Sequence, residues 1–357
     1  MKQTVLVAMS SGVDSSVAAA LLVEQGHTVV GVTMKTFCYS ETRAHARTCC
    51  GLDGIQDARR VADTLGIAHY VFDMEESFTA AVIDDFVSEY AAGRTPNPCV
   101  RCNSNTKIPD LLERGRLLGA DWIATGHYAR LEPGPGGRRR LLRGTDADKD
   151  QSYFLWGVPS GSIARLLFPV GTLTKPDVRR YARGLDLVTA EKPESQDICF
   201  VPTGTYADFL GRRLGADHPA VTPGRLVTRD GTVVGSHGGY GRYTVGQRRG
   251  LGGGFGTPLY VLGVRPAQNE VVVGEETELY GDRIEVADLN WLTVPPGVGD
   301  VIDIQIRHRA RAVPARLVSI GPDAARFALL EPQRAITPGQ SGAVYRGEEL
   351  IGGGRIR

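Results

Sequence analysis

The sequence has almost no net charge, because 41 Lys and Arg residues balance 40 Asp and Glu residues among its 357. A chain this balanced has no overall attraction to a polyanion, so any contact with nucleic acid must come from local basic patches. It also has no apolar run near the roughly 18 residues that a membrane-spanning helix needs. Without such a run or a charged-then-apolar leader, we expect a cytoplasmic protein with no membrane partner.

Cysteine is scarce as well, with six residues in the chain. In a reducing cytosol we expect these to be ligands, catalytic thiols or buried fillers and not structural disulfides. Two common nucleotide-binding patterns are absent, the G-x-x-x-x-G-K-[ST] of P-loops and the G-x-G-x-x-G of dinucleotide folds. A nucleotide site in this chain therefore needs a different kind of loop.

One such loop follows the first apolar run. Residues 5–16 read VLVAMSSGVDSS, which predicts a buried strand, a tight loop at Ser10-Ser11-Gly12 and a helix that ends near Gln25. Small residues let backbone N–H groups approach an anion, and the positive end of the helix faces it. The pattern predicts a phosphate-binding loop; the alternative is a Ser-rich cap on an ordinary helix.

The order of the elements predicts the fold. Strand-like runs at 29–34, 69–72 and 122–125 alternate with helical stretches at 56–65, 77–92 and 109–118, which is typical of an α/β, doubly wound parallel sheet. The ligand of such a sheet lies beyond the carboxyl ends of its strands. Between residues 128 and 143 we expect a hairpin whose Arg138-Arg139-Arg140 run is a solvated edge that discourages strand pairing, with phosphate contact as the alternative. A further helix is expected over 175–185.

The character of the sequence changes after Thr203, where glycine becomes dense and helix periodicity fades. We expect a small mixed linker domain there, followed after Glu275 by five strand runs that predict a C-terminal β-barrel. A chain of this length favours two or three domains. The expected boundaries are 1–202 for a catalytic domain, 203–274 for the linker domain and 275–357 for the barrel.

Three cysteines could carry chemistry. Cys99 and Cys102 form a C-x-x-C motif, and the prolines before it are expected to present both thiols on a loop ahead of a helix that begins at Pro109. The motif alone permits a zinc half-site, a redox pair or part of an iron–sulfur site. Cys199 lies between Ile and Phe, where spacing alone favours a buried filler. A zinc site of Cys38, His45, Cys49 and Cys50 lacks the usual spacing, so flexible-loop residues are the favoured interpretation there.

Residues 10–16 resemble the S-G-G-x-D-S-S pattern of ATP pyrophosphatases, the PP-loop enzymes, except that Ser11 replaces a glycine. If that position needs a positive φ, serine costs about 1 kcal/mol there. Other strings extend the resemblance over essentially the whole chain, to the tRNA-specific 2-thiouridylase family. They are Gly126-His127-Tyr128, Asp150-Gln151-Ser152-Tyr153-Phe154, Phe168-Pro169-Val170-Gly171, Cys199-Phe200, Thr244-Val245-Gly246-Gln247-Arg248-Arg249-Gly250-Leu251 and Thr337-Pro338-Gly339-Gln340-Ser341.

The resemblance implies an ATP-dependent reaction on the wobble uridine of tRNA, usually the tRNAs for Lys, Glu and Gln. ATP and Mg²⁺ would adenylate the C2 oxygen, pyrophosphate would leave into the loop, and a sulfur nucleophile would displace AMP. In the persulfide account, Cys199 carries sulfur from a donor protein, and Cys102 releases it as sulfide or closes a Cys102–Cys199 disulfide. Both roles need activated thiolates.

One departure changes the expected cofactor. Some relatives carry Asp at the position of Cys99, where it is thought to assist proton transfer. With Cys99 present, three thiols, Cys99, Cys102 and Cys199, could hold a 4Fe-4S cluster that leaves one iron open for an extra sulfide. The resemblance therefore favours the cluster, with sulfide or a donor protein as the sulfur source, and keeps the persulfide as the alternative.

The residues leave alternatives to this function open. The reaction could be that of another PP-loop enzyme, a 4-thiouridine synthase or an amidotransferase-type synthetase. A non-catalytic RNA-binding or iron–sulfur protein is the alternative outside enzymes.

The remaining site residues are also implied by the resemblance, although His127 could simply cap its strand. The expected ATP contacts are Ala8, Met9, Ser10, Ser11, Gly12, Val13, Asp14, Ser15, Met34 and Gly126. The expected contacts of the target base are Asn97, Pro98 and Cys99, and those of tRNA are His127, Lys149, Asp150, Gln151, Arg307, His308 and Gln340.

Overall fold

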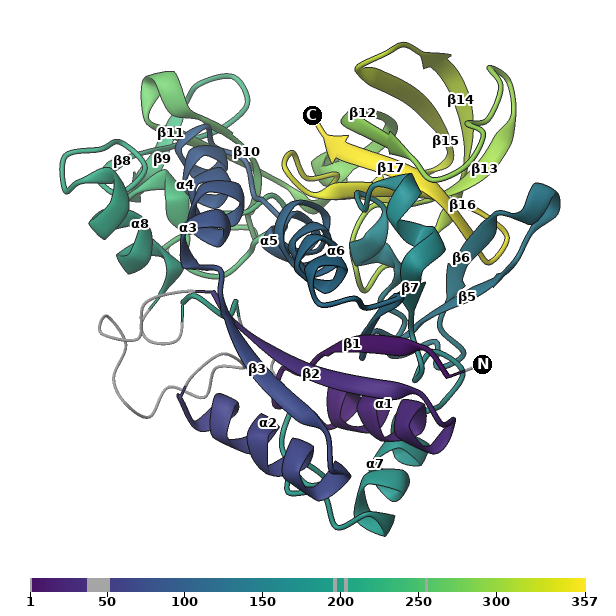
Figure 1. Cartoon of the computed structure of the whole chain (residues 1–357). Helices are drawn as coiled ribbons and strands as arrows, with labels where there is room; N and C mark the ends of the chain where they lie inside the picture. The colour runs from purple at the N-terminus through teal and green to yellow at the C-terminus, as the bar shows by residue number, and fades with distance from the viewer. Residues whose placement is uncertain (1, 37–51, 195–197, 202–204, 254–255) are drawn as a thin grey trace. The chain divides into compact units, whose positions relative to one another are not determined.

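The computed structural model describes residues 2–36, 52–194, 198–201, 205–253 and 256–357. They form two compact units (Figure 1). The first unit comprises Met1–Val82, Cys99–Thr203 and Glu348–Ile351, and the second comprises Ile83–Pro98, Gly204–Gly347 and Gly352–Arg357. The division into three domains stays a prediction. No helix in the described ranges is both long and apolar enough to cross a membrane.

A parallel sheet forms the centre of the first unit, in the order β3-β2-β1-β4-β7. All four strand pairings along this sheet are parallel, which confirms the prediction of a doubly wound α/β sheet. The chain leaves β1 toward β2 on one side and returns to β4 on the other, so the strand order reverses beside β1. The strands are β1 (Thr4–Ala8), β2 (Thr28–Lys35), β3 (Ala68–Asp73), β4 (Trp122–Thr125) and β7 (Leu166–Leu167).

Alternating side chains of β1 face different helices, as the period of a strand requires. Val5 and Val7 are buried in one cluster with residues of α1 (Val13–Glu24), α2 (Leu52–Leu65) and α7 (Lys175–Gly184). Leu6 faces the other side, where α6 (Ile108–Leu117) packs so closely that a Cβ on Gly115 would lie 3.4 Å from it. Both faces of the sheet are thus covered, which explains the continuous apolar run of the first strand.

The C-x-x-C motif lies in a helix, so the expectation of a loop was wrong. A helical run continues through α5 (Pro98–Arg101), the π-helix η3 (Cys102–Lys107) and α6. Pro98 occupies the first helical position, where its missing N–H is tolerated. Pro109 follows the π-helical turn, at which the regular hydrogen-bond ladder is already interrupted. The expectation of a loop rested on the two prolines before the motif, but Pro96 lies ahead of α5 and Pro98 begins it, so neither interrupts the helix.

The predicted hairpin is present as β5 (Ala129–Pro133) and β6 (Arg139–Arg143), joined by η4 (Pro135–Gly137). Its arginine run is not a solvated edge, because β6 also pairs with Glu349 of β17. Arg138 lies 3.3 Å from Glu349, and Arg140 lies 3.6 Å from Glu132. The positive charges are balanced within the unit, which allows the strand pairing that we had expected them to prevent. Further short helices of the first unit are α3 (Glu75–Phe78), η5 (Ser152–Leu155) and η6 (Ser160–Arg165).

The second unit begins inside a predicted helix. The expected helix at 77–92 is a run of α3, the π-helix η2 (Thr79–Ile83) and α4 (Asp84–Ala91). Phe86 and Tyr90 of α4 pack against aromatic rings of α8 (Tyr206–Leu214), with centroids 6.1 and 5.4 Å apart. Helix α8 was missed, although Thr205 and Asp208 form a capping box at its start.

A sheet in the order β10-β11-β8-β9 follows, and its parallel β11–β8 pair among antiparallel ones agrees with the expected mixed character. Its strands are β8 (Gly224–Val227), β9 (Val233–His237), β10 (Tyr260–Arg265) and β11 (Glu270–Gly274). The short helices η7 (Tyr240–Arg242), η8 (Pro266–Gln268) and η9 (Glu276–Leu279) lie around it.

The C-terminal barrel is confirmed. Its strands follow the order β12-β15-β14-β13-β16-β17, and β12 also pairs with β17, which closes the barrel. Strand β17 was not among the expected runs because glycines interrupt it. A Cβ on Gly352 or Gly354 would lie 2.5 Å from a backbone oxygen of β12, so the close approach of the two strands requires glycine. The barrel strands are β12 (Tyr280–Trp291), β13 (Val301–Gln305), β14 (Val313–Ile320), β15 (Ala324–Arg334), β16 (Ser341–Arg346) and β17 (Glu349–Ile356).

Candidate nucleotide and thiol site

The loop at residues 10–16 closes onto the start of α1 through hydrogen bonds between its own residues. The backbone N–H of Ser10 donates to Ser15 Oγ at 3.1 Å, and the hydroxyls of Ser15 and Ser16 donate to the carbonyl of Gly12 at 3.1 and 3.0 Å. These bonds hold the turn that leads into the helix, whose first N–H groups have no partners within the helix. The loop thus has the geometry expected of an anion-binding turn.

Ser11 has a φ of +58°, in the left-handed region. This position therefore does need a positive φ, as the glycine of the resembled pattern had suggested. For a serine the conformation costs about 1 kcal/mol or more. Its side chain makes one bond that glycine cannot make, because Ser11 Oγ accepts a hydrogen bond from Lys192 Nζ at 3.1 Å.

Gly126 follows β4 and packs directly on the loop. A Cβ at this position would lie 2.6 Å from the backbone nitrogen of Ser15 and 2.7 Å from the carbonyl carbon of Asp14. Real Cβ atoms do not come this close, so only glycine allows the contact. Two segments that the sequence assigned to one nucleotide site are thus adjacent.

The other expected nucleotide residues end neighbouring strands. Ala8 ends β1 beside Thr125 of β4, and the backbone N–H of Met9 donates to Val32 of β2 at 2.8 Å. Met34 lies near the end of β2 with 8% of its surface exposed. The loop, Met34 and Gly126 all lie at the carboxyl edge of the sheet, where the strand order reverses.

Asp14 of the loop is held by two residues that the sequence did not identify as partners. Tyr128 donates its hydroxyl to Asp14 Oδ1 at 2.7 Å, and Lys175 Nζ lies 2.7 and 2.8 Å from the two carboxylate oxygens. Burial and the charge of Asp14 raise the pKa of Tyr128 well above its usual value, so the phenol stays protonated. No local pattern could have found Lys175, which lies 161 residues from Asp14 in the chain.

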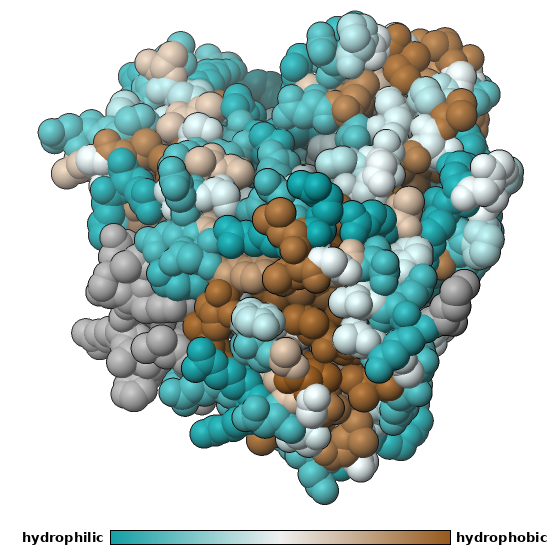
Figure 2. All heavy atoms as spheres, in the orientation of Figure 1, coloured by the Kyte–Doolittle hydropathy of each residue, from teal (hydrophilic) through white to brown (hydrophobic). Residues whose placement is uncertain are grey.

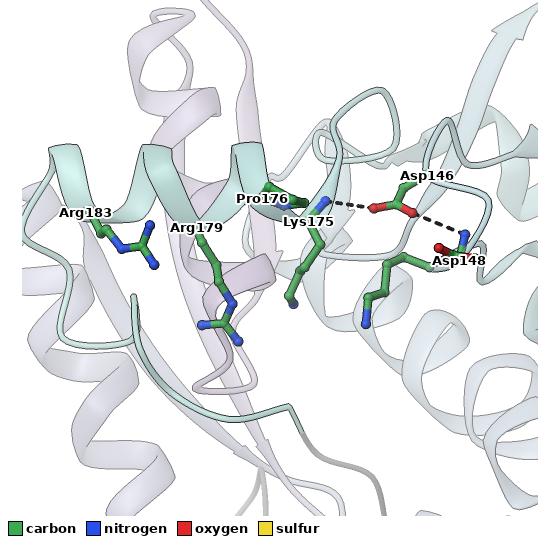
Figure 3. A pocket seen from close by; sticks show the side chains of 7 residues that line it. Asp146, Asp148, Lys175, Pro176, Arg179 and Arg183 are labelled. Atoms are coloured by element: carbon green, nitrogen blue, oxygen red, sulfur yellow. Dashed lines mark hydrogen bonds between the residues drawn. The ribbon is translucent and has the colours of Figure 1, made fainter.

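A pocket of about 490 Å³ lies beside this network, along α7 (Figure 3). Lys175, Arg179 and Arg183 follow one another at four-residue spacing, and Figure 3 shows them on the same side of the helix. The backbone N–H of Lys175 donates to Asp146 Oδ2 at 2.8 Å. The full lining is Asp146, Asp148, Lys149, Lys175, Pro176, Arg179 and Arg183.

The expected tRNA residues of the first unit mostly bond within the protein. Lys149 Nζ lies 2.9 Å from Glu194, and Asp150 accepts bonds from Arg143, Gly144 and Ser152. Gln151 Oε1 accepts from the backbone of Tyr128 at 3.1 Å. The string around Asp150 and Gln151 therefore shapes the turn beside the nucleotide loop.

His127 is buried, which fits the strand-capping alternative more closely than an exposed contact. Its Nδ1 lies 2.6 Å from Thr125 Oγ1, and its ring packs edge-on against Phe168 at 5.8 Å. Burial lowers the pKa of His127 well below its usual value, and the charge of Lys107 adds to this shift. The imidazole is therefore neutral at physiological pH.

In the second unit, Gln340 lies against the segment that leads to Asn97. Its Nε2 donates to the carbonyls of Thr95 and Pro96 at 2.9 and 3.2 Å. The preceding Gly339 has a φ of +91°, and a Cβ there would lie 2.8 Å from Thr95 nitrogen. The string at 337–341 thus holds the approach to the expected base-binding residues, a role that sequence reasoning did not anticipate.

Arg307 and His308 follow β13 in the same unit, and both are half-buried. Arg307 Nη2 donates to the carbonyls of Val245 and Ala335 and to Thr337 Oγ1, at distances of 2.7 to 3.0 Å. The carbonyl of His308 accepts a bond from Gln305 at 2.8 Å. Arg307 therefore joins two of the strings on which the family resemblance rests.

The three thiols differ in exposure. Cys99 is exposed, whereas Cys102 and Cys199 are half-buried. Phe200 packs on Phe78 of α3 with ring centroids 5.9 Å apart, and α3 also packs on η3, which Cys102 begins. Helix α3 thus contacts both the Cys199 segment and η3.

Within the described ranges, no group of three or more Cys, His, Asp or Glu side chains is arranged to hold a metal ion. A 4Fe-4S cluster on Cys99, Cys102 and Cys199 stays a prediction from the sequence. The alternative zinc ligands at Cys38, His45, Cys49 and Cys50 lie outside the described residues.

Three family models together match nearly the whole chain. Residues 3–203 match a model described as "tRNA methyl transferase HUP domain", and residues 207–275 match a "tRNA methyl transferase PRC-barrel domain". Residues 281–356 match an "Aminomethyltransferase beta-barrel domain". A solved NMN synthetase from Francisella tularensis is 17% identical, covers 60% of this chain and 77% of its own, and has a TM-score of 0.35, which is too low to support an inference.

Full-length relatives are much more similar. The tRNA-specific 2-thiouridylase MnmA of Geotalea uraniireducens is 47% identical, over 99% of this chain and 95% of the relative. Those of Geobacter metallireducens and Carboxydothermus hydrogenoformans are both 48% identical, over 99% of this chain and 97% and 98% of their own lengths. With such identity along its whole length, the chain belongs to the tRNA-specific 2-thiouridylase family of enzymes.

Proposed function

We propose that this chain is an ATP-dependent tRNA-uridine 2-sulfurtransferase that activates the C2 oxygen of the wobble uridine with ATP and replaces it with sulfur. The observation that carries the proposal is the loop at residues 10–16, backed by Gly126 at a distance that only glycine permits. This geometry suits an anion released at the start of α1, and the products would be AMP, pyrophosphate and 2-thiouridine.

The proposed nucleotide site comprises the loop, the strand ends and Gly126. Backbone N–H groups of the loop would bind the β- and γ-phosphates, and Mg²⁺ would neutralise part of their charge. The adenine would lie near Met34, at the end of β2. The uridine oxygen would attack the α-phosphate. The proposed contacts are Ala8, Met9, Ser10, Ser11, Gly12, Val13, Asp14, Ser15, Met34 and Gly126.

Sulfur transfer can be written with Cys199 and Cys102 alone. A donor protein would leave Cys199 as a persulfide, whose terminal sulfur attacks C2 as AMP departs and thereby joins Cys199 to the base through a disulfide bond. The Cys102 thiolate would then attack the Cys199 sulfur, which frees 2-thiouridine and leaves a Cys102–Cys199 disulfide. Thiols of the donor protein would reduce that disulfide for the next cycle. Each sulfur–sulfur bond formed is thus matched by one that breaks.

The three-cysteine set favours a 4Fe-4S cluster, which Cys99, Cys102 and Cys199 would hold and which would supply an open iron for an extra sulfide. The two-cysteine route is the alternative to it. Anaerobic purification tests it. If the cluster is present, the protein contains iron and sulfide and shows broad visible absorbance, and Cys199→Ala removes that absorbance. If iron-free protein thiolates tRNA with a persulfide donor, the cluster is excluded and the two-cysteine route is supported.

For tRNA binding, we propose that Asn97, Pro98 and Cys99 border the flipped base, as the start of α5. His127, Lys149, Asp150, Gln151, Arg307, His308 and Gln340 remain candidates for tRNA contact or for shaping the surfaces that make it. The proposed substrates are the tRNAs for Lys, Glu and Gln, and the proposed compartment is the cytoplasm. The three functional regions would be 1–202, 203–274 and 275–357.

The decisive assay incubates the protein with ATP, Mg²⁺, a sulfur donor and each candidate tRNA, and then measures pyrophosphate and the mass of the wobble nucleoside. We expect pyrophosphate only with cognate tRNA and a gain of one sulfur for one oxygen at the uridine. Sulfur at another position, such as C4, would contradict the proposal. So would pyrophosphate formed without any modified base.

A further inference from the structure

The nucleotide loop contains no cation of its own, since residues 10–16 read SSGVDSS. Pyrophosphate carries several negative charges, and its departure needs more compensation than backbone N–H groups and one helix end provide. Two ammonium groups from outside the loop reach it in the described part of the chain. They belong to Lys175, the first residue of α7, and to Lys192, which lies in the segment that follows this helix.

Lys175 is the more buried of the two, with 9% of its side chain exposed. Its Nζ contacts both oxygens of Asp14 and lies 3.2 Å from Glu194 Oε1. Glu194 is shared with Lys149, at 2.9 Å. Burial alone would raise the pKa of Glu194, but its bonds to Lys149 and Lys175 outweigh this and hold the pKa below its usual value. The carboxylate thus stays charged and occupies Lys175.

Lys192 approaches the loop at Ser11. Its Nζ donates to Ser11 Oγ at 3.1 Å and to Asp57 Oδ2 of α2 at 2.7 Å. The side chain is about one-third exposed, so the ammonium can change partners without leaving water entirely. The left-handed Ser11 therefore links the loop to a cation, which a glycine at this position would not do.

Both lysines are neutralised by carboxylates in this state, with Asp14 and Glu194 at one and Asp57 at the other. An ammonium is a compact charge with three rotatable donors, so it can exchange a carboxylate for a phosphate oxygen. We propose that Lys175 and Lys192 bind the pyrophosphate that leaves ATP at this loop, that Ser11 positions Lys192 for it, and that Glu194 competes with the phosphate for Lys175. The assignment rests on the proposed function for the identity of the anion.

The first test measures the binding of Mg²⁺-pyrophosphate and of AMP to the full chain by calorimetry, with no tRNA present. Lys192→Met should weaken pyrophosphate binding about tenfold, the loss typical of a hydrogen bond to a charged group, and change AMP binding less than about twofold. Arg183→Met is the matched control, because Arg183 lies at the far end of α7 and pairs with Glu191. It should change neither affinity. Equal pyrophosphate affinity in Lys192→Met and the parent chain would overturn the proposal.

The second test uses the sign of an effect that a structural role does not produce. Glu194→Gln removes the competing charge from Lys175, so pyrophosphate should bind about threefold more tightly, although an ion pair has been lost. Weaker or unchanged binding would contradict the competition. Lys175→Met would destabilise the fold, because it removes the cation that pairs with Asp14 and Glu194. Glu194→Gln therefore examines Lys175 without removing it.

The role of Ser11 is separated by a double-mutant cycle. Ser11→Gly should weaken pyrophosphate binding about threefold in the parent chain and leave it unchanged in Lys192→Met, because the hydroxyl acts through the lysine. Equal effects in both backgrounds would refute that link. These readouts need neither tRNA nor sulfur, so the lysines can be shown to bind pyrophosphate even if thiolation fails, and the reverse outcome is equally distinct.

Discussion

The nucleotide loop and the thiol-bearing segments belong to one unit but are built in different ways. The loop is fixed by backbone contacts, its own serine hydroxyls and the close approach of Gly126. Cys99 and Cys102 instead begin a helical run, and Cys99 is exposed. Figure 2 shows hydrophilic residues over much of the visible face, with apolar residues gathered in the lower part of the view. The comparison teaches that the nucleotide loop depends on backbone shape, whereas the role proposed for the thiols depends on the chemistry of their side chains.

The largest effect is expected at Cys199, where a side chain can be changed without altering backbone shape. Cys199→Ser should lower thiolation by about 1,000-fold or more, since a hydroxyl cannot carry the transferred sulfur. ATP binding should stay within about twofold of the parent chain. Nucleoside mass spectrometry and ATP calorimetry measure the two quantities. Substantial thiolation by this variant would show that sulfur reaches the base by another route.

For the nucleotide loop, the corresponding prediction concerns the close packing of Gly126 against its backbone. Gly126→Ala places a Cβ 2.6 Å from a backbone nitrogen, which should destabilise the unit by about 2 kcal/mol and weaken ATP binding by more than about tenfold. Gly211→Ala in α8 is the control, because nothing lies within 4 Å of its Cβ. Urea unfolding and ATP titration compare them. Equal behaviour of the two variants would mean that the backbone around Ser15 yields easily.

The third prediction concerns the carboxylate of Glu194, which pairs with both Lys149 and Lys175. The folded-state pKa of Glu194 is lowered, so its contribution to stability is present above the ordinary value of 4.5 and is lost as the pH falls through the folded-state pKa. Glu194→Gln should therefore cost about 1 kcal/mol at pH 6 and less below pH 4.5, after allowance for partial exposure. Urea unfolding at both pH values measures the difference.

The control for that experiment is Glu191→Gln, because the Glu191 carboxylate is also ion-paired, with Arg183, but lies on the surface. Its cost should be smaller at every pH, since exposed pairs contribute little. A loss from Glu194→Gln that is the same at pH 6 and at pH 3.5 would show that its effect does not come from ionisation.

The difference between local and long-range contacts also explains how much of this structure the sequence could predict. The parallel sheet, the loop after β1 and the barrel follow from apolar periodicity and small-residue turns, which are local signals. The helical C-x-x-C was mispredicted because Pro96 and Pro98 argue against a helix, whereas Pro98 begins α5, and the π-turn that follows has no clear local signal. Lys175 and Gln340 were not recognised as partners, since their contacts join positions 161 and 245 residues apart. Tertiary neighbours of this kind have no pattern in one sequence.

The smallest effect is expected at Ser11, where the strain of the backbone and the hydrogen bond of the side chain oppose each other within one residue. Ser11→Gly removes a left-handed strain of about 1 kcal/mol but adds a similar cost in chain entropy and loses the bond to Lys192, so stability should change by less than about 1 kcal/mol. Ser11→Ala keeps the strain and loses the bond, so it should be the less stable of the two variants. Urea unfolding of the parent chain and both variants measures the order. If alanine were as stable as serine, the hydroxyl would contribute nothing to the folded loop, and its value would lie only in the anion that Lys192 helps to bind.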